Sequence, residues 1–302
     1  MSNSTKFYDA LKTHGRWFYP SVASVYEREK EICDWMLTPL ATWAEAVYGE
    51  EVFEVAAKGY AEYCLSVSKA QRAYEETGVF NPSDVGAITR EIYQEKKVMT
   101  PYMWAVVLIY PFWPSMINHL FLFRDHFLNT LPENPRIVEL GCGHGVVGML
   151  GAAHRRDATL IGYDISPGAI EIASALRGET GFGERARFEV RDVLELGSFA
   201  DAPEDKFHGV IAAMLAEHLE DPRPLFASIR GAVRPGGLAF VSTAIESAQD
   251  DHVYEFHHES EPAKMAEDVG LRVRRMVSDR GSAIAGGRYV PRAVAMVLEC
   301  PE

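Results

Sequence analysis

Three alternate glycines, Gly141, Gly143 and Gly145, follow an apolar run that begins at Arg136. Glycine has no Cβ, so the backbone can turn sharply there and approach a ligand closely, and a loop that leads into a helix presents backbone N–H groups to that ligand. A helix-compatible segment, 146–153, follows the last glycine. The pattern predicts a strand, a binding loop and a helix, and such a loop can hold a nucleoside or an amino-acid carboxylate.

Acidic residues follow the next two predicted strands. Asp164 ends the apolar run 159–164, and Asp192 follows the run 187–191. An acid at the tip of the second strand of a β-α-β unit can accept both hydroxyl protons of a ribose, and an acid at the next strand edge suits an adenine amine. We therefore expect a nucleoside site at one edge of a sheet. To the same site we assign the residues directly after the two acids, Ile165 and Val193.

The strand-like runs alternate with helical patterns in the second half of the chain. Two further runs, 209–214 and 237–243, each precede or follow a helical pattern, which predicts an α/β fold with a doubly wound parallel sheet. The first part of the chain instead reads as helix. Apolar residues recur at helical spacing, Gly78 is suited to a C-cap, and Asn-Pro-Ser-Asp restarts a helix, so we expect helices over 27–43, 50–76 and 81–97.

Together these motifs resemble those of the class I S-adenosylmethionine-dependent methyltransferases. The sequence VELGCGHG at 138–145 matches their glycine motif, while 215–222 and 233–237 resemble the segments after strand four and before strand five. The G-x-G-x-G spacing differs from the G-x-G-x-x-G of dinucleotide enzymes. The resemblance implies a Rossmann-like catalytic domain at 133–302 that binds S-adenosylmethionine, preceded by a helical extension or lid at 1–132.

The resemblance also implies roles for single residues. The three glycines would cradle the methionyl part of the cofactor, and Glu139 would organise their loop. Asp164 would bind the ribose and Asp192 the adenine, and Met214 would lie beside the cofactor after the fourth strand.

Composition narrows the class of protein. The chain has 302 residues, of which 47% are hydrophobic, enough for a substantial core. Its net charge of −13 argues against nucleic acid as a partner. The four cysteines are widely spaced and no signal peptide is evident, so we expect reduced thiols in a cytoplasmic protein. The extension would serve as a lid or as the contact of a homodimer.

The segment 98–123 contains no formally charged residue and is long enough to span a bilayer. Three prolines interrupt it, so we expect hinged helices buried against the catalytic domain and no membrane span. Most of its aromatic residues are expected to pack in the core. Because a sulfonium cation is stabilised by aromatic faces, Tyr102 and Trp113 are predicted to face the cofactor or substrate.

Histidines are the candidates for acid-base chemistry. His218, just beyond the fourth strand, is predicted to be catalytic, because histidine exchanges protons near neutral pH; the alternative is a histidine that only packs. His144 would shape the glycine loop. The adjacent His257 and His258 point in different directions on a regular element and make a poor chelator, so we predict no metal site. Tyr254 could line the pocket.

Missing motifs restrict the substrate. The stretch Ala-Ala-Met-Leu at 212–215 replaces the Asn/Asp-Pro-Pro-aromatic motif of enzymes that methylate nucleobase or glutamine amines, and Met214 stands where a metal-dependent catechol enzyme would need an acid. We therefore expect methyl transfer to a small molecule, with secondary metabolism as the setting. A second hypothesis is cyclisation of S-adenosylmethionine itself, with release of methylthioadenosine, as in the azetidine-2-carboxylate synthases. A third is a non-catalytic binding protein that retains the fold.

Overall fold

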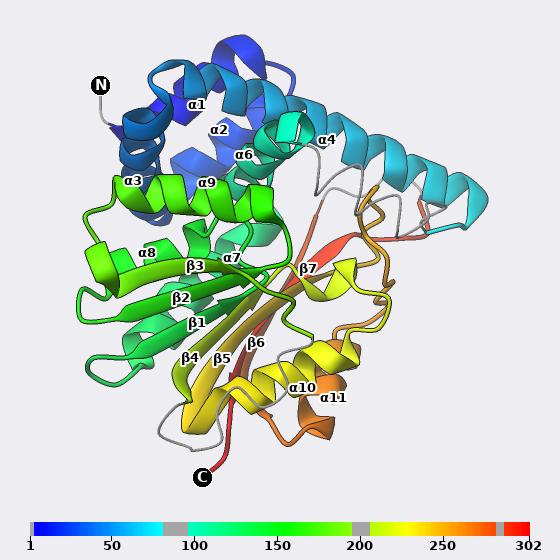
Figure 1. The fold of residues 1–302 in the computed structure, drawn as a ribbon. Coiled ribbons are helices and arrows are strands. Elements are labelled where there is room, and N and C mark those ends of the chain that lie inside the picture. Colours follow the sequence, from blue (N-terminus) through cyan, green and yellow to red (C-terminus); the bar gives the residue numbers. More distant parts are fainter. Residues whose placement is uncertain (1–2, 81–95, 195–205, 282–286) are drawn as a thin grey trace.

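A single seven-stranded sheet forms the centre of the protein in a computed structural model that describes residues 3–80, 96–194, 206–281 and 287–302 (Figure 1). The strand order is β3-β2-β1-β4-β5-β7-β6. The strands are β1 (Arg136–Leu140), β2 (Thr159–Asp164), β3 (Ala186–Val190), β4 (Phe207–Ala213), β5 (Val233–Ile245), β6 (Arg272–Arg280) and β7 (Arg292–Glu299).

The sheet is parallel from β3 through β5, as the alternation of elements predicts, but β7 runs antiparallel to both β5 and β6. The predicted α/β sheet is confirmed, with the difference that its β7 edge is antiparallel. A parallel neighbour needs a long crossover connection, whereas antiparallel neighbours can be joined by a short one. Only residues 281–291 separate β6 from β7.

Each face of the sheet carries its own hydrophobic core. Successive side chains of a strand point to opposite faces, so Ile137 joins one core and Val138 the other. The helices α10 (Arg223–Ala232) and α11 (Ser260–Asp268) cover the second face. The first face is covered by α8 (Val146–His154) and α9 (Pro167–Gly178), and its core continues into the N-terminal helices.

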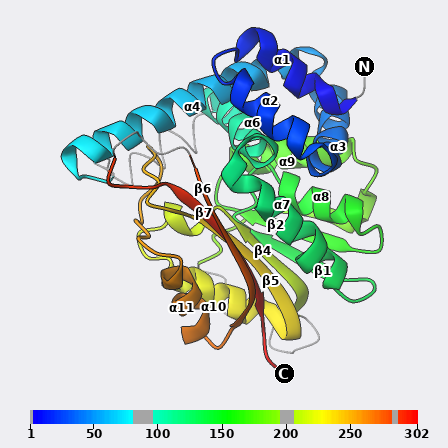
Figure 2. The ribbon, with the colours of Figure 1, turned by 180° about the vertical axis from the view of Figure 1, so that it is seen from behind.

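The N-terminal helices gather at one end of the molecule, opposite α10 and α11 (Figures 1 and 2). They are α1 (Lys6–His14), α2 (Tyr19–Arg28), α3 (Lys30–Tyr48), α4 (Glu51–Thr77) and α6 (Lys96–Phe112), and α7 (Ile117–Phe121) follows them against the sheet. The helix predicted over 27–43 is in fact two, because the backbone breaks at Glu29. The second predicted helix is confirmed as α4, and Gly78 caps it in the left-handed conformation, with φ 72° and ψ 10°. The helix predicted over 81–97 lies outside the described residues as far as residue 95.

The uncharged segment is bent at its prolines. Helix α6 ends at Phe112, and Trp113 is extended, with φ −96° and ψ 130°, because the following Pro114 disfavours a helical conformation for the residue before it. None of the described helices is by itself long and apolar enough to cross a membrane. The stretches Tyr102–Phe112 and Pro114–Thr130 meet that test only as a pair, and they are bent by 79°.

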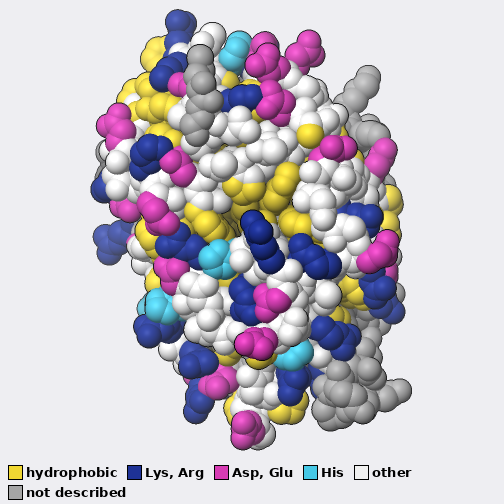
Figure 3. All heavy atoms as spheres, turned by 90° about the vertical axis from the view of Figure 1, so that its left-hand side faces the viewer, with side chains coloured by type: hydrophobic (Ala, Val, Ile, Leu, Met, Phe, Trp, Pro, Cys, Tyr) yellow, Lys and Arg dark blue, Asp and Glu magenta, His cyan; other side chains and the backbone are white. Residues whose placement is uncertain are grey.

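Charged side chains of both signs are interspersed over the face drawn in Figure 3, and hydrophobic side chains gather across its middle. This face lies on the side of the molecule where α3, α8 and α9 are found in Figure 1. Beneath this surface, the N-terminal helices and the first face of the sheet share one apolar core. This core fixes the helices above the edge of the sheet.

Candidate active site

A cavity of about 340 Å³ lies where the carboxyl ends of β1, β2 and β4 meet the N-terminal helices. In parallel α/β sheets, ligands bind outside the carboxyl ends of the strands, where neighbouring connections diverge. The glycine loop, the tips of β2 and β4 and the loop after β4 form one wall. Helix α6 and Tyr63 of α4 form the other, so the extension closes the site.

The three glycines of the loop have left-handed backbones, with φ of 65°, 51° and 69° at Gly141, Gly143 and Gly145. A Cβ at Gly145 would lie 2.6 Å from the Phe188 ring, and one at Gly141 would lie 2.7 Å from Leu215. At Gly143 the nearest atom is the sulfur of Met103 across the cavity, at 3.7 Å. Packing therefore requires glycine at the outer two positions, whereas the middle one leaves room for a ligand.

Asp164 ends β2 and lines the cavity, as predicted. Its carboxylate accepts hydrogen bonds from the backbone nitrogens of Gly143, at 2.7 Å, and Ser166, at 2.8 Å. Burial raises the pKa of Asp164, and these two N–H groups oppose the rise. Each carboxylate oxygen has a second lone pair, so the group can accept ribose hydroxyls while it holds the glycine loop.

Glu139 is buried at the end of β1 and also lines the cavity. It accepts a hydrogen bond from the backbone nitrogen of Gly148, at 3.1 Å. Burial raises the pKa of Glu139 to about 8, which keeps the carboxyl protonated at neutral pH. The side chain links β1 to the first turn of α8.

The remaining predicted cofactor residues also line the cavity: Ile165, Asp192, Val193 and Met214. Asp192 accepts a hydrogen bond from the backbone nitrogen of Leu194, at 2.8 Å. Met214 has a left-handed backbone with φ 50°, uncommon outside glycine, and its nitrogen donates to the Ser242 carbonyl at 2.9 Å. This turn directs the chain after β4 along the rim of the cavity.

His218 and Tyr102 both contact Asp251 at one end of the cavity. The Tyr102 hydroxyl donates to the Asp251 carboxylate. Nδ1 of His218 lies 2.9 Å from the Asp251 backbone carbonyl oxygen and 3.7 Å from the carboxylate. Burial lowers the pKa of His218, but the Asp251 and Glu217 carboxylates outweigh this effect and raise the pKa overall.

Two further polar residues meet His218, and sequence reasoning missed both. Glu217 is fully buried, and Thr243 donates to its Oε2 at 2.7 Å. His252 is buried, and its ring lies 5.1 Å from the His218 ring, edge to face. One ligand atom from each of Glu217, His218 and His252 lies within 4.8 Å of the other two. Glu217 adjoins His218 in the sequence, whereas His252, 34 residues further on, approaches His218 only through the fold.

Other predicted residues lie outside the cavity lining. The Trp113 ring stacks on Tyr63, with centroids 6.0 Å apart and planes at 25°, which places it one layer behind the wall. Tyr254 packs on Phe256. His257 and His258 are mostly exposed. His144, in contrast, lines the cavity, and its Nδ1 accepts a hydrogen bond from the backbone nitrogen of Val146 at 3.0 Å. Tyr63, from α4, and Tyr110, from α6, are aromatic residues of the wall that the sequence did not single out.

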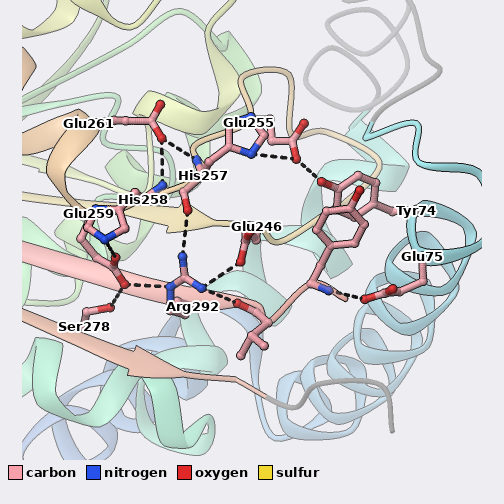
Figure 4. A network of polar contacts seen from close by, with 12 residues as sticks. Tyr74, Glu75, Glu246, Glu255, His257, His258, Glu259, Glu261, Ser278 and Arg292 are labelled. Atoms are coloured by element: carbon pink, nitrogen blue, oxygen red, sulfur yellow. Dashed lines mark hydrogen bonds and ion pairs between the residues drawn. The ribbon is translucent and has the colours of Figure 1, made fainter. Parts of the chain in front are cut away.

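The loop after β5, which carries Asp251 and His252, is fixed at both of its ends. Figure 4 shows Arg292 of β7 in contact with Glu246 at 2.8 Å, Glu259 at 2.7 Å and the His257 carbonyl at 2.9 Å. In the same view Tyr74 of α4 donates to Glu255. Further contacts join α4 to the middle of the loop: Tyr63 to Gln249, Ser66 to Asp250 and Gln71 to Ala248. The helical extension therefore positions the polar end of the cavity.

Comparison with known proteins agrees with this arrangement. Residues 112–275 match a family described as "Methyltransferase domain". The ubiquinone biosynthesis O-methyltransferase of Leptothrix cholodnii is 27% identical over 108 residues, 36% of this chain and 43% of that one. The protein of the same name from Methylobacterium nodulans is 32% identical over 146 residues, 45% of this chain and 54% of that one. The chain thus spans about half the length of the curated relatives it matches.

A solved structure shares the fold. The phosphoethanolamine N-methyltransferase 2 of Haemonchus contortus, in complex with S-adenosyl-L-methionine, aligns with a TM-score of 0.55 and 13% identity, covering 73% of this chain and 60% of that one. At this identity the likeness concerns the fold alone.

Proposed function

Because the chain belongs to the class I S-adenosylmethionine-dependent methyltransferases, we propose that it transfers a methyl group from this cofactor to a small molecule held near His218. One observation carries the proposal. The glycine loop, the acids after β2 and β3 and the polar group around His218 all line the same cavity of about 340 Å³.

The residues at one end of this cavity fit the cofactor. The open space at Gly143 admits a ligand next to the backbone, and Asp164 is placed to bind ribose hydroxyls. Asp192 and Val193 line the same cavity and would contact the adenine, and Glu139 would organise the glycine loop around the methionyl part. When bound there, S-adenosylmethionine supplies an electrophilic methyl group on a sulfonium. The aromatic wall excludes water and can stabilise that positive charge.

The polar end of the cavity fits the acceptor. Methyl transfer requires a nucleophile opposite the S–CH₃ bond, and an oxygen or nitrogen nucleophile must also lose its proton. We assign His218, which is oriented by Asp251, as the group that accepts this proton. Tyr102 of α6 donates a hydrogen bond to Asp251 and so supports its position. The O-methyltransferases among the relatives favour oxygen. The cavity lies near the lower end of the roughly 300–1,000 Å³ typical of ligand pockets, so the acceptor is small, and we place the enzyme in small-molecule biosynthesis.

A panel of small hydroxylated acceptors tests this function. The protein should release S-adenosylhomocysteine only when a suitable acceptor is present. His218→Gln should then lower kcat and leave the Kd for S-adenosylmethionine within about twofold, because the histidine acts on the acceptor and not on the cofactor. A variant that binds the cofactor poorly but turns over normally would contradict the assignment of His218. Tight cofactor binding with no turnover on any acceptor would support a binding protein instead.

The size and lining of the cavity also favour a second candidate function, cyclisation of S-adenosylmethionine. Tyr63, Tyr102 and Tyr110 line a space with limited room for a separate acceptor. The cofactor's own amine would attack its γ-carbon, forming a C–N bond as the C–S bond breaks, and methylthioadenosine would leave. Release of methylthioadenosine from the cofactor alone, above the non-enzymatic rate, would select this activity.

A further inference from the structure

We propose that Glu217, His218 and His252 bind a divalent metal ion of the zinc type at the polar end of the cavity. The proposal rests on the proposed function for the position of the acceptor, and it replaces the proton-accepting role given there to His218 with metal binding. It differs from the sequence-based expectation of no metal site, because that expectation weighed His257 and His258, which are exposed. The three proposed ligands come from two loops, after β4 and after β5, that meet beside the cavity.

The distances among the three side chains suit a single ion. One nitrogen from each histidine and one carboxylate oxygen of Glu217 lie within 4.8 Å of one another. Zinc–ligand bonds are about 2.0–2.2 Å for histidine nitrogen and carboxylate oxygen, so ligand atoms on one ion lie within about twice that distance of each other. Only a small inward movement of the side chains is needed to close the group.

Hydrogen bonds orient the imidazoles as metal ligands require. Nδ1 of His218 lies 2.9 Å from the Asp251 carbonyl oxygen, and Nδ1 of His252 lies 2.7 Å from the Ser247 carbonyl oxygen. A carbonyl can only accept, so each Nδ1 carries the proton and Nε2 is the unprotonated ring nitrogen. Metal-binding histidines almost always donate their second ring nitrogen in this way, which fixes the tautomer and the ring orientation.

Glu217 provides an independent indication of a ligand. Its side chain is fully buried, and Oε1 has no hydrogen-bond partner among the residues that the structure describes. The other oxygen is fixed by Thr243 at 2.7 Å, and the Glu217 carbonyl is held by the backbone nitrogens of Val253 and Tyr254, at 2.7 and 2.9 Å. A buried polar atom without a partner is costly, and a bound cation would satisfy it.

The charges of the surroundings agree with a divalent cation. Two neutral imidazoles and one carboxylate carry a single negative charge, and the Asp251 carboxylate adds another beside His218. Mixed nitrogen and oxygen ligands favour zinc or a similar transition-metal ion over Mg²⁺, which prefers oxygen ligands alone. Three protein ligands leave a coordination position for an acceptor oxygen, whose pKa the ion would lower. His218 would then act by holding the ion.

Calorimetric titration of the full-length, chelator-treated protein with Zn²⁺ tests the proposal without turnover. We expect a single ion per chain and no comparable binding of Mg²⁺. His252→Gln and Glu217→Gln should each lower the Zn²⁺ affinity about 100-fold or more, since even residues that only orient metal ligands contribute about 10–100-fold. The matched control is His258→Gln, which removes a nearby exposed histidine and should leave the affinity unchanged.

Two further measurements keep the test decisive. If a buried variant does not fold, Co²⁺ added to the wild-type protein should give the strong visible absorption of a four- or five-coordinate site; the weak spectrum of hydrated Co²⁺ would refute the proposal. Zn²⁺ binding that is lost in His258→Gln, or kept in both buried variants, would also refute it. Asp164→Asn should weaken S-adenosylmethionine binding without affecting Zn²⁺, so failure of the metal site and failure of the cofactor site are distinguishable.

Discussion

The buried carboxyl of Glu139 makes the stability of the protein depend on pH, and Glu139→Gln should remove that dependence. The side chain is 2% exposed, and its carboxyl accepts a hydrogen bond from the Gly148 nitrogen at 3.1 Å. Glutamine has nearly the same shape and can accept the same hydrogen bond. The substitution therefore changes little except the ability to ionise.

The expected magnitude follows from the pKa. Burial raises the pKa of Glu139 from 4.5 to about 8, so the folded protein keeps the proton over a range in which the unfolded chain has lost it. The unfolded state then binds fewer protons than the folded state, and the free energy of unfolding falls as pH rises from about 4.5 to about 8. Each unit is worth about 1.36 kcal/mol, so this group alone removes on the order of 4 kcal/mol between pH 5 and pH 8.

Urea unfolding without cofactor, at pH 5, 6, 7 and 8, measures this effect. The free energy of unfolding of Glu139→Gln minus that of the wild type should increase steadily with pH, because all other titrating groups cancel in the difference. Glu267→Gln, at an exposed glutamate of α11, is the matched control and should give a constant difference. A constant difference for Glu139→Gln as well would refute the raised pKa.

The remaining predictions concern the cavity wall. Gly143→Ala should cost about 1–2 kcal/mol in backbone strain and sharply reduce S-adenosylmethionine affinity measured by calorimetry, whereas Gly145→Ala should lower the melting temperature much more, because its Cβ would lie 2.6 Å from a packed ring. Asp164→Ala should abolish measurable cofactor binding while circular dichroism still shows a folded protein; unchanged affinity would refute the ribose assignment. Tyr102→Phe should lower kcat more than it changes cofactor affinity, because it loses the bond to the Asp251 carboxylate. Trp113→Leu, behind the wall, should reduce stability more than kcat, and the reverse would restore a direct role for that ring.

The parts of the site that follow from local sequence were predictable. Gly143 and Asp164 belong to one strand-helix-strand unit, in which Gly143 follows β1 and Asp164 ends β2. Because β1 and β2 are parallel neighbours, their carboxyl ends lie side by side. Glycine spacing and an acid at a strand tip therefore bring these residues to one edge of the sheet, where we propose the cofactor site, without knowledge of the rest of the fold. His218 lies in the loop after β4, at the same edge, for the same reason.

The parts that depend on tertiary contacts were not predictable. Tyr63 and His252 lie far from the motifs in sequence, and each enters the cavity through packing of α4 against the loop after β5. Of the two aromatic residues predicted to face the site, Tyr102 lines the cavity and Trp113 does not, because helical spacing does not say which face of a bent helix pair meets the sheet. The reversal of strand β7 was not predicted, because its only sequence signal is that residues 281–291 are too short a connection for a parallel neighbour of β6.

The identity of the nucleoside product tests the central claim most directly. The purified protein is incubated with S-adenosylmethionine, with and without a small hydroxylated acceptor, and the products are separated by chromatography and identified by mass. Methyl transfer predicts no product above the non-enzymatic background without acceptor, and S-adenosylhomocysteine in equal amount to the methylated acceptor when one is present. Methylthioadenosine formed from the cofactor alone, accompanied by a cyclic amino acid, would contradict the account.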